Sequence, residues 1–177
     1  MTRISYCTSM SDQVRDLVAE RGNLNIYRAL AHAGEPFAGW MLAGRAALTS
    51  TVVPARLREL VILRTGHLMK CPYEIAQHTY LAEDFGVGSR QRDALAADGR
   101  LAEGGFSPAE LAVLEMTTEL VTTASLAPAR LDRLREVLGD EQLLEVLMII
   151  NRWSGLALMI NALDVDIDTG TRFSPPR

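Results

Sequence analysis

The segment Glu59–His78, E-L-V-I-L-R-T-G-H-L-M-K-C-P-Y-E-I-A-Q-H, contains the residues on which both the fold and the candidate site depend. Proline lacks a backbone N–H and is therefore typical of the first position of a helix. Pro72 thus predicts that a helix begins here, and the preceding helix must then end near Met69. Two helices joined by a short turn are the expected local structure.

The helix that begins at Pro72 places three chemically active side chains on one face. Cys71 stands at or near the N-cap, and Glu74 and His78 follow at spacings of three and four residues. This spacing puts them within an arc of roughly 60°. The helix N-terminus favours negative charge, so the Cys71 thiolate is predicted to be stabilised and reactive. A thiol, an acid and a base in one patch indicate proton or thiol chemistry.

Glu59 is a fourth candidate catalytic residue, on the preceding helix. On one continuous helix it would lie roughly 18 Å from Cys71, too far for direct exchange. A break at Met69–Cys71 would fold Glu59 back toward the pocket. Its role therefore depends on that bend.

Each of these residues also has a structural interpretation. A lone cysteine is more often an inert, buried side chain than a nucleophile, a lone histidine is often a core or surface residue, and a glutamate is usually solvated. The shared face is what favours chemistry. Arg64 and Arg152 are weaker candidates for binding a substrate carboxylate. Asn151, Arg152 and Trp153 interrupt an apolar helix, and they fit either a pocket lining or an oligomer interface.

Composition restricts the class of protein. A chain of 177 residues, 48% hydrophobic and 23% charged, suits a single globular domain, expected to span 1–177. The net charge of −4 argues against nucleic acid as a partner. The cluster of Arg90, Arg92 and Arg100 fits a solvated helix face better than an anion site.

Neither cofactors nor membranes are expected as partners. The two cysteines, Cys7 and Cys71, form no disulfide framework and no zinc motif. Glu74 and His78 alone would make a poor metal site, and no flavin or nucleotide motif occurs. The first residues lack a signal-peptide pattern, and the apolar run Leu143–Ile150 is too short to span a bilayer. These features predict a cytoplasmic protein that acts on a small molecule.

Helical periodicity dominates the chain, and no strand-turn-strand pattern is convincing. The fold class is therefore predicted to be all-α, a helical bundle. The expected helices are Ser11–Arg21, Tyr27–His32, Pro36–Leu48, Pro54–Met69, Pro72 to Gly86, Ser89–Ala97, one from the Ser107 cap to Thr123, Pro128–Leu138, and Glu141–Leu163 capped by Asp140. The last helix is apolar on nearly all sides, which predicts that it is central or buried against another subunit.

The chain resembles the carboxymuconolactone decarboxylase / alkyl hydroperoxidase D-like superfamily. The resemblance rests on the run from Arg58-Glu59-Leu60 through Cys71-Pro72-Tyr73-Glu74 and His78 to Ala82 and Gly86. Tyr27–His32 and Leu144–Leu163 match the usual layout as well, so that a core of about 25–165 is covered. The resemblance implies an all-helical fold and assembly into a homo-oligomer, as a trimer, hexamer or dimer.

The resemblance carries over to the site in part. In the hydroperoxidase D branch, a glutamate, two cysteines in CxxC spacing and a histidine form a proton relay. Glu59, Cys71 and His78 match this set, whereas Glu74 replaces the second cysteine, so the local resolving thiol is missing. Classical carboxymuconolactone decarboxylases generally lack the cysteine and rely on histidine and acidic groups. The chain thus resembles an intermediate subgroup with the pattern CxYExxH.

Three functions remain open on the sequence. The leading one is a cofactor-free lyase or decarboxylase for a small carboxylated or lactone substrate. In it His78 transfers a proton, Glu74 orients His78, and Cys71 donates a proton or polarises the substrate. The second is a single-cysteine thiol peroxidase or redox protein, in which Glu59 and His78 move protons and a small thiol or Cys7 resolves the sulfenic acid. The third is a non-enzymatic helical assembly that binds a small molecule.

Overall fold

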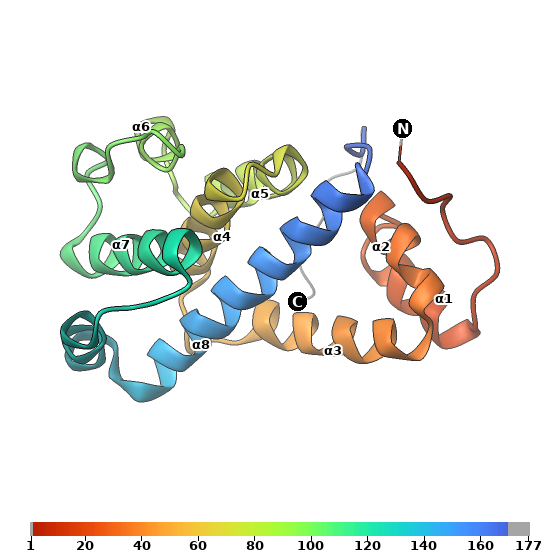
Figure 1. Ribbon diagram of the computed structural model, residues 1–177, viewed down its shortest axis with the longest axis horizontal. Coiled ribbons are helices and arrows are strands. Elements are labelled where there is room, and N and C mark those ends of the chain that lie inside the picture. Colours follow the sequence, from red (N-terminus) through yellow and green to blue (C-terminus); the bar gives the residue numbers. More distant parts are fainter. Residues whose placement is uncertain (1, 170–177) are drawn as a thin grey trace. The chain divides into compact units, whose positions relative to one another are not determined.

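The computed structural model describes residues 2–169, and every regular element in that range is a helix. This confirms the all-α prediction (Figure 1). The elements are α1 (Asp12–Glu20), α2 (Asn25–Leu30), η1 (Ala31–Ala33), α3 (Glu35–Thr49), α4 (Ala55–Leu68), α5 (Pro72–Asp84), α6 (Ser89–Ala94), η2 (Leu101–Glu103), α7 (Pro108–Thr123) and α8 (Pro128–Leu163).

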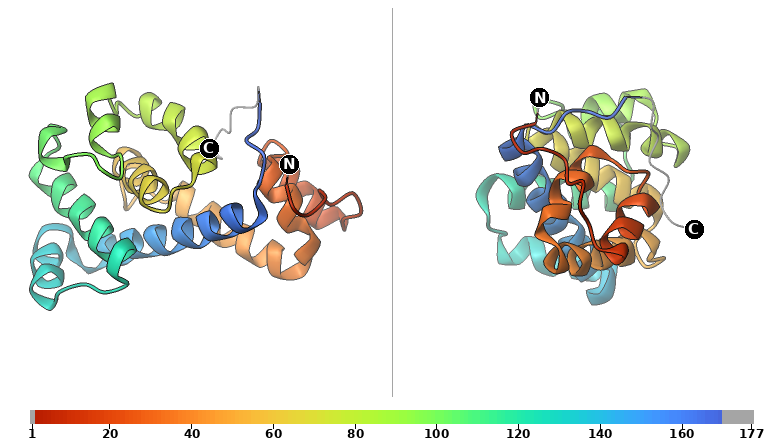
Figure 2. Two further views of the ribbon diagram at one scale, coloured as in Figure 1. Left: turned by 45° about the horizontal axis from the view of Figure 1, so that its top comes forward. Right: turned by 90° about the vertical axis from the view of Figure 1, so that its right-hand side faces the viewer.

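The chain forms two compact units. Of the described residues, one unit contains 2–50 together with 159–169, and the other is Thr51–Leu158. The first unit has its own apolar core under α1 and α3, which appear red and orange in Figure 2: Val14, Val18, Ala31, Phe37 and Met41, with Cys7. The second unit contains every candidate site residue. A single domain over 1–177 stays a prediction.

Local signals set the helix boundaries of the second unit. Ser107 caps α7, accepting a hydrogen bond from the Glu110 N–H at 3.2 Å, while the Glu110 carboxylate accepts from the Ser107 N–H at 2.8 Å. This reciprocal pair satisfies two free N–H groups, and the predicted helix to Thr123 is confirmed. Gly86, at φ +78°, closes α5 as expected for a glycine just past a helix end.

Two capping predictions were wrong. Gly88, not Ser89, is the N-cap of α6, and the helix ends at Ala94, short of the predicted Ala97. Asp140 uses its carboxylate to accept from Arg135, with one N–H···O distance of 2.7 Å, and so belongs to an exposed ion pair. Gly139 does interrupt the last helix as expected, at φ 74° and ψ 167°. The element α8 therefore consists of two helices that meet at a kink at Gly139, which confirms the predicted break (Figure 1).

The turn between α4 and α5 positions the site. Lys70 adopts a left-handed conformation at φ +51°, and the Cys71 N–H donates to the Gly66 carbonyl at 2.9 Å. These features end α4 and reverse the chain. A Cβ on Gly66 would lie 3.4 Å from the Cβ of Glu74. The glycine thus lets α5 pack directly along α4, as both figures show.

Helix α8 is long and apolar enough to cross a membrane by length and composition alone. One such helix is weak evidence, because the core helix of a folded domain passes the same test. Of its most apolar 18-residue window, 44% is buried within the structure. Leu143, Val146 and Ile149 lie on the buried side, which agrees with a central helix.

Candidate functional site

The predicted bend brings Glu59 to His78. The Nδ1 atom of His78, on α5, lies 2.7 Å from Oε2 of Glu59, on α4, and both side chains are buried. The antiparallel return of α5 along α4 makes this contact possible. No contact of Glu59 with the Cys71 sulfur is seen. Glu59 therefore acts on the imidazole and not directly on the thiol.

Trp153 contacts the other nitrogen of the same ring. Its indole Nε1–H, from α8, donates to Nε2 of His78 at 3.1 Å, and the two rings meet edge to face at 82°. An indole N–H can only donate, so Nε2 must be the unprotonated nitrogen. Nδ1 then carries the proton, and its N–H donates a hydrogen bond to Oε2 of Glu59. His78 is neutral in this arrangement, and both of its nitrogens are occupied.

Glu74 is the acid of the site that has one carboxylate oxygen without a hydrogen-bond partner. Its Oε2 lies 3.5 Å from Nε2 of His78, too far for a good hydrogen bond, and its Oε1 is buried with no hydrogen-bond partner. Burial raises the pKa of Glu74 to about 7, although the positive charges of His78 and Arg152 act to lower it. A carboxyl group in this state exchanges protons near neutral pH.

The pKa of His78 is raised as well, but by a different balance. Burial opposes the charged imidazolium, whereas the charge and hydrogen bond of Glu59 favour it, with a further contribution from Glu74. Arg58 acts in the opposite direction, and its Nε lies 3.7 Å from Oε1 of Glu59. The His78 pKa therefore depends on two carboxyl groups and on a buried guanidinium.

The prediction that Cys71 carries a stabilised thiolate was wrong. The residue is indeed the N-cap of α5, but its side chain is entirely buried. Burial raises the pKa of Cys71 to about 11, and the Glu74 charge adds to this, although the backbone N–H groups of Glu74 and Tyr73 act the other way. Desolvation outweighs the helix N-terminus here.

We therefore expect Cys71 to alkylate slowly at neutral pH. In a Cys7→Ser background, the rate of iodoacetamide labelling should rise only above about pH 10, because the pKa of Cys71 is about 11. Denatured protein supplies the reference thiol, with a pKa near 8.5. A midpoint below the denatured value would contradict this burial argument.

The two candidate arginines have different surroundings. Arg64 donates from Nε to Oγ1 of Thr118 at 3.0 Å and from Nη1 to the carbonyls of Leu95 and Ala96, and it is only 4% exposed. It therefore satisfies carbonyls at the end of α6 and is not available to a substrate. Arg152 is half-buried over the Trp153 ring, and its charge lowers the Glu74 pKa. Arg152 remains the arginine candidate near the site.

Sequence reasoning missed two buried polar residues in this region. Gln77 is 5% exposed and its Oε1 has no hydrogen-bond partner, and Arg58 is 4% exposed with an Nε that makes an ion pair with Glu59 but no hydrogen bond. Gln77 follows Glu74 by three residues on α5, so helical spacing could have identified it. Arg58 precedes Glu59 on α4, and no pattern separates it from an ordinary surface arginine.

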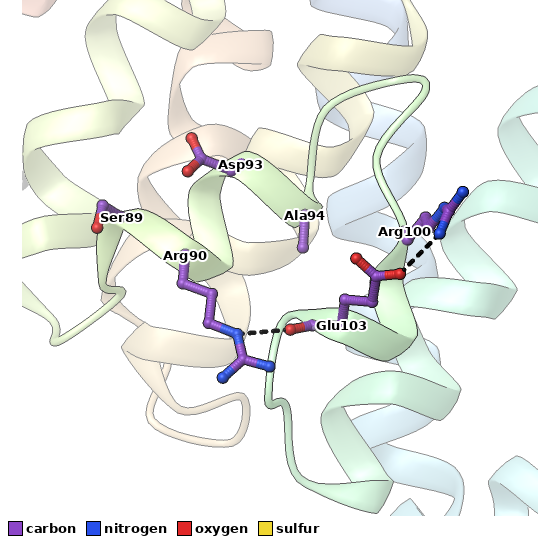
Figure 3. A pocket seen from close by; sticks show the side chains of 6 residues that line it. All are labelled: Ser89, Arg90, Asp93, Ala94, Arg100 and Glu103. Carbon is purple, nitrogen blue, oxygen red and sulfur yellow. Dashed lines mark hydrogen bonds and ion pairs between the residues drawn. The ribbon is translucent and has the colours of Figure 1, made fainter.

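A separate hollow of about 610 Å³ lies beside α6 and η2 and contains part of the arginine cluster (Figure 3). Arg90 donates to the Glu103 carbonyl at 2.7 Å, and Arg100 pairs with the Glu103 carboxylate at 3.0 Å. Asp93 adds a further negative charge to the lining. These exposed, mutually paired charges form a solvated face. Within residues 2–169, no group of three or more metal-ligating side chains is arranged to hold an ion.

Comparisons with known proteins agree with the all-helical fold. A model of the carboxymuconolactone decarboxylase family matches residues 35–119. A peroxidase-related protein with an alkylhydroperoxidase AhpD core, from Ralstonia eutropha JMP134, superposes with a TM-score of 0.78 at 18% identity, over 90% of this chain and 87% of that one. A search of curated proteins finds no significant match.

The debrominase Bmp8 has a similar structure as well. Its apo form gives a TM-score of 0.73 at 15% identity, over 89% of this chain and 87% of that one. A cysteine-to-alanine variant of Bmp8 in complex with 2,3,4-tribromopyrrole gives 0.70 at 15% identity, over 95% and 94%. Residues 35–119 therefore match the carboxymuconolactone decarboxylase family, and the chain shares the fold of these solved structures.

Proposed function

We propose that this protein is a cofactor-free enzyme that uses acid–base chemistry on a small carboxylated or lactone substrate, as a lyase or decarboxylase. The observation that carries the proposal is Glu74, a buried carboxyl group with one unpartnered oxygen and a pKa of about 7. Efficient general acids and bases have pKa values near the working pH. A buried acid of this kind is costly to maintain, and such groups cluster at functional sites.

The contacts favour a division of roles that differs from the sequence interpretation. Both nitrogens of His78 are occupied, by Glu59 and Trp153, whereas Oε1 of Glu74 has no partner. Glu74 is therefore the group that exchanges a proton with substrate, and His78 orients and tunes Glu74. Cys71 remains a protonated thiol beside it, and Arg152 supplies a positive charge for a substrate carboxylate.

The chemistry of decarboxylation matches this arrangement. When a vinylogous acid loses carbon dioxide, the electrons of the breaking C–C bond pass into the conjugated system as a dienolate. The dienolate carbon then takes the proton of Glu74, and the resulting Glu74 carboxylate regains a proton from solvent. No electron acceptor is needed. The step requires a neutral carboxyl group at working pH, which burial of Glu74 supplies.

Release of carbon dioxide from a panel of unsaturated carboxylic acids and carboxylated lactones tests the proposal. We expect turnover in the wild type, little change in Cys71→Ser, and loss in Glu74→Gln. The proposal fails if no member of the panel releases carbon dioxide or takes up a proton at carbon. It also fails if Cys71→Ser abolishes the reaction while Glu74→Gln retains it.

Thiol chemistry at Cys71 is the second candidate. The names of the similar structures favour it, because one is peroxidase-related and the other is a debrominase crystallised with tribromopyrrole as a cysteine-to-alanine variant. Attack by Cys71 on peroxide would oxidise the sulfur to a sulfenic acid, which a small thiol reduces. The raised pKa of Cys71 opposes this function. A peroxide rate well above that of free cysteine would favour it over acid–base chemistry.

We also propose that the protein self-associates through α8. Leu144, Met148 and Leu158 are 59%, 68% and 60% exposed, and they lie within an arc of roughly 80° on one helix. A second copy of the same stripe is the occupant that matches this pattern, because two apolar helix faces bury each other.

Met148→Glu is expected to weaken that association about tenfold or more, since it buries a charge in the paired face. Sedimentation over a range of concentrations measures the change. Val137→Glu is the matched control, because Val137 is 55% exposed outside the stripe. Equal masses for the wild type and Met148→Glu at all concentrations would contradict this interface.

A further inference from the structure

We propose that Trp153 is a positioning residue that keeps the mobile proton of the site on Glu74 and off His78. This inference rests on the proposed acid–base role of Glu74. Trp153 reaches the site from α8, with its ring edge against the imidazole and its side chain 3% exposed. Its indole N–H meets the one imidazole nitrogen that could otherwise accept a proton from Glu74.

Two arrangements of the same proton are possible at this site. In the first, Glu74 is a neutral acid and His78 is neutral, with its Nε2 lone pair accepting from Trp153. In the second, one proton has moved from Oε2 of Glu74 to Nε2 of His78, across the present separation of 3.5 Å. The His78 imidazolium would then face a Glu74 carboxylate. The step is a proton transfer alone and involves no change of oxidation state.

The indole N–H separates these two arrangements. A protonated Nε2 has no lone pair, so its N–H would point against the indole N–H, and Trp153 would be a buried donor without an acceptor. In the first arrangement the Trp153 N–H and both His78 nitrogens have partners, whereas neither oxygen of Glu74 makes a good hydrogen bond within the site. Trp153 thus stabilises the neutral acid that the reaction uses.

The charged neighbours of His78 would not by themselves keep the proton on Glu74. Glu59, from α4, and Glu74, from α5, both favour the imidazolium, and Arg58, from α4, opposes it. Arg152, from α8, favours an ionised Glu74. The two carboxyl groups that act on His78 therefore favour the second arrangement, and Trp153 is the neutral group that counters them.

Nitrogen NMR of the wild type tests the proposal without a substrate. The chain has three histidines and two tryptophans, so the spectra are simple. At pH 7, His78 should show one protonated and one unprotonated nitrogen, with the proton on Nδ1. The Trp153 indole N–H resonance should shift as His78 titrates. An indole resonance that does not respond to pH would overturn the proposal.

The variant Trp153→Phe removes only the N–H among polar groups. His78 should then protonate on both nitrogens at pH 7, and its apparent pKa should rise by about one unit, as expected for one lost hydrogen bond to the neutral form. In Trp153→Phe/Glu74→Gln the imidazole should return to neutral, since the carboxylate is gone. Trp40→Phe, in the other compact unit, is the control for a lost indole.

A structural role alone would not produce this pattern. If the proposal is right, activity at pH 7 and below is already lower in Trp153→Phe than in the wild type, because the shared proton then lies on His78 and not on Glu74. A His78 pKa that stays within a few tenths of the wild-type value in folded Trp153→Phe would overturn the inference. The NMR result does not depend on turnover, so failure of the proposed reaction and failure of this inference are separable.

Discussion

Replacing Glu74 by glutamine is expected to lower turnover about 100-fold or more, the usual contribution of a general acid. Glutamine keeps the size and polarity of the side chain but cannot give up a proton. Glu74 is the site acid with an unpartnered buried oxygen, and its pKa of about 7 makes it half protonated near neutral pH. The wild-type rate should decline above about pH 7, as the acid form is lost.

The same substitution is expected to stabilise the fold at alkaline pH. The folded-state pKa of Glu74 lies at about 7, above the ordinary value of 4.5. The stability that this difference provides is complete below pH 4.5 and is lost as the pH rises through 7. Above that range the buried carboxylate costs on the order of 3 kcal/mol. The raised pKa of His78 has the same sign.

Urea unfolding of Glu74→Gln and wild type at pH 5 and pH 8 measures this effect. The variant should gain stability over the wild type between the two pH values, because it carries no carboxylate to bury. Glu83→Gln, on the solvent side of the same helix, is the control and should show no comparable gain. A variant that is inactive but gains nothing at pH 8 would mean that Glu74 is solvated and not a buried acid.

Arg64→Met is expected to lower the free energy of unfolding by about 3 kcal/mol. The guanidinium of the buried Arg64 donates to the Leu95 and Ala96 carbonyls and to Thr118. Methionine fills a similar volume but leaves these acceptors without their donor. The loss should appear as a lower urea concentration at the unfolding midpoint, with an unchanged dependence of the unfolding free energy on urea concentration.

Arg152→Gln is the variant to compare with Arg64→Met, because it removes the other candidate arginine. Arg152 is half-buried and acts on Glu74 through its charge, so its loss should weaken substrate binding and change stability little. Arg64→Met should keep the wild-type KM as long as the protein is folded. A raised KM in Arg64→Met without a loss of stability would restore Arg64 as a substrate-binding residue.

Local signals in the sequence predicted most of the fold. The proline, serine and glycine signals around α5 and α7 predict these helices, because such signals act through backbone groups of near neighbours. Asp140 shows the limit of the method. Its carboxylate can accept a hydrogen bond either from a helix N-terminus or from a side chain. In the folded protein it accepts from Arg135. A capping preference cannot show which partner will be nearby.

The sequence predicted the central side chains of the candidate site, but it did not predict Gln77 and Arg58 or the pKa shifts of the site. Helical spacing brought Cys71, Glu74 and His78 together, and the bend at Lys70 brought Glu59 to His78. The sign of the Cys71 pKa shift could not be predicted, since it depends on burial by residues distant in the chain. The Trp153 contact spans 75 residues of sequence and had no local signal.

Carbon-13 NMR titration of the glutamate carboxyl groups is the measurement to make, with Glu74→Gln to identify the Glu74 resonance by its absence. It needs no substrate and observes the proposed acid itself. A midpoint at about 7 is expected for Glu74. A midpoint near the ordinary glutamate value of about 4.3 would leave Glu74 ionised at neutral pH and would contradict its proposed role as a general acid.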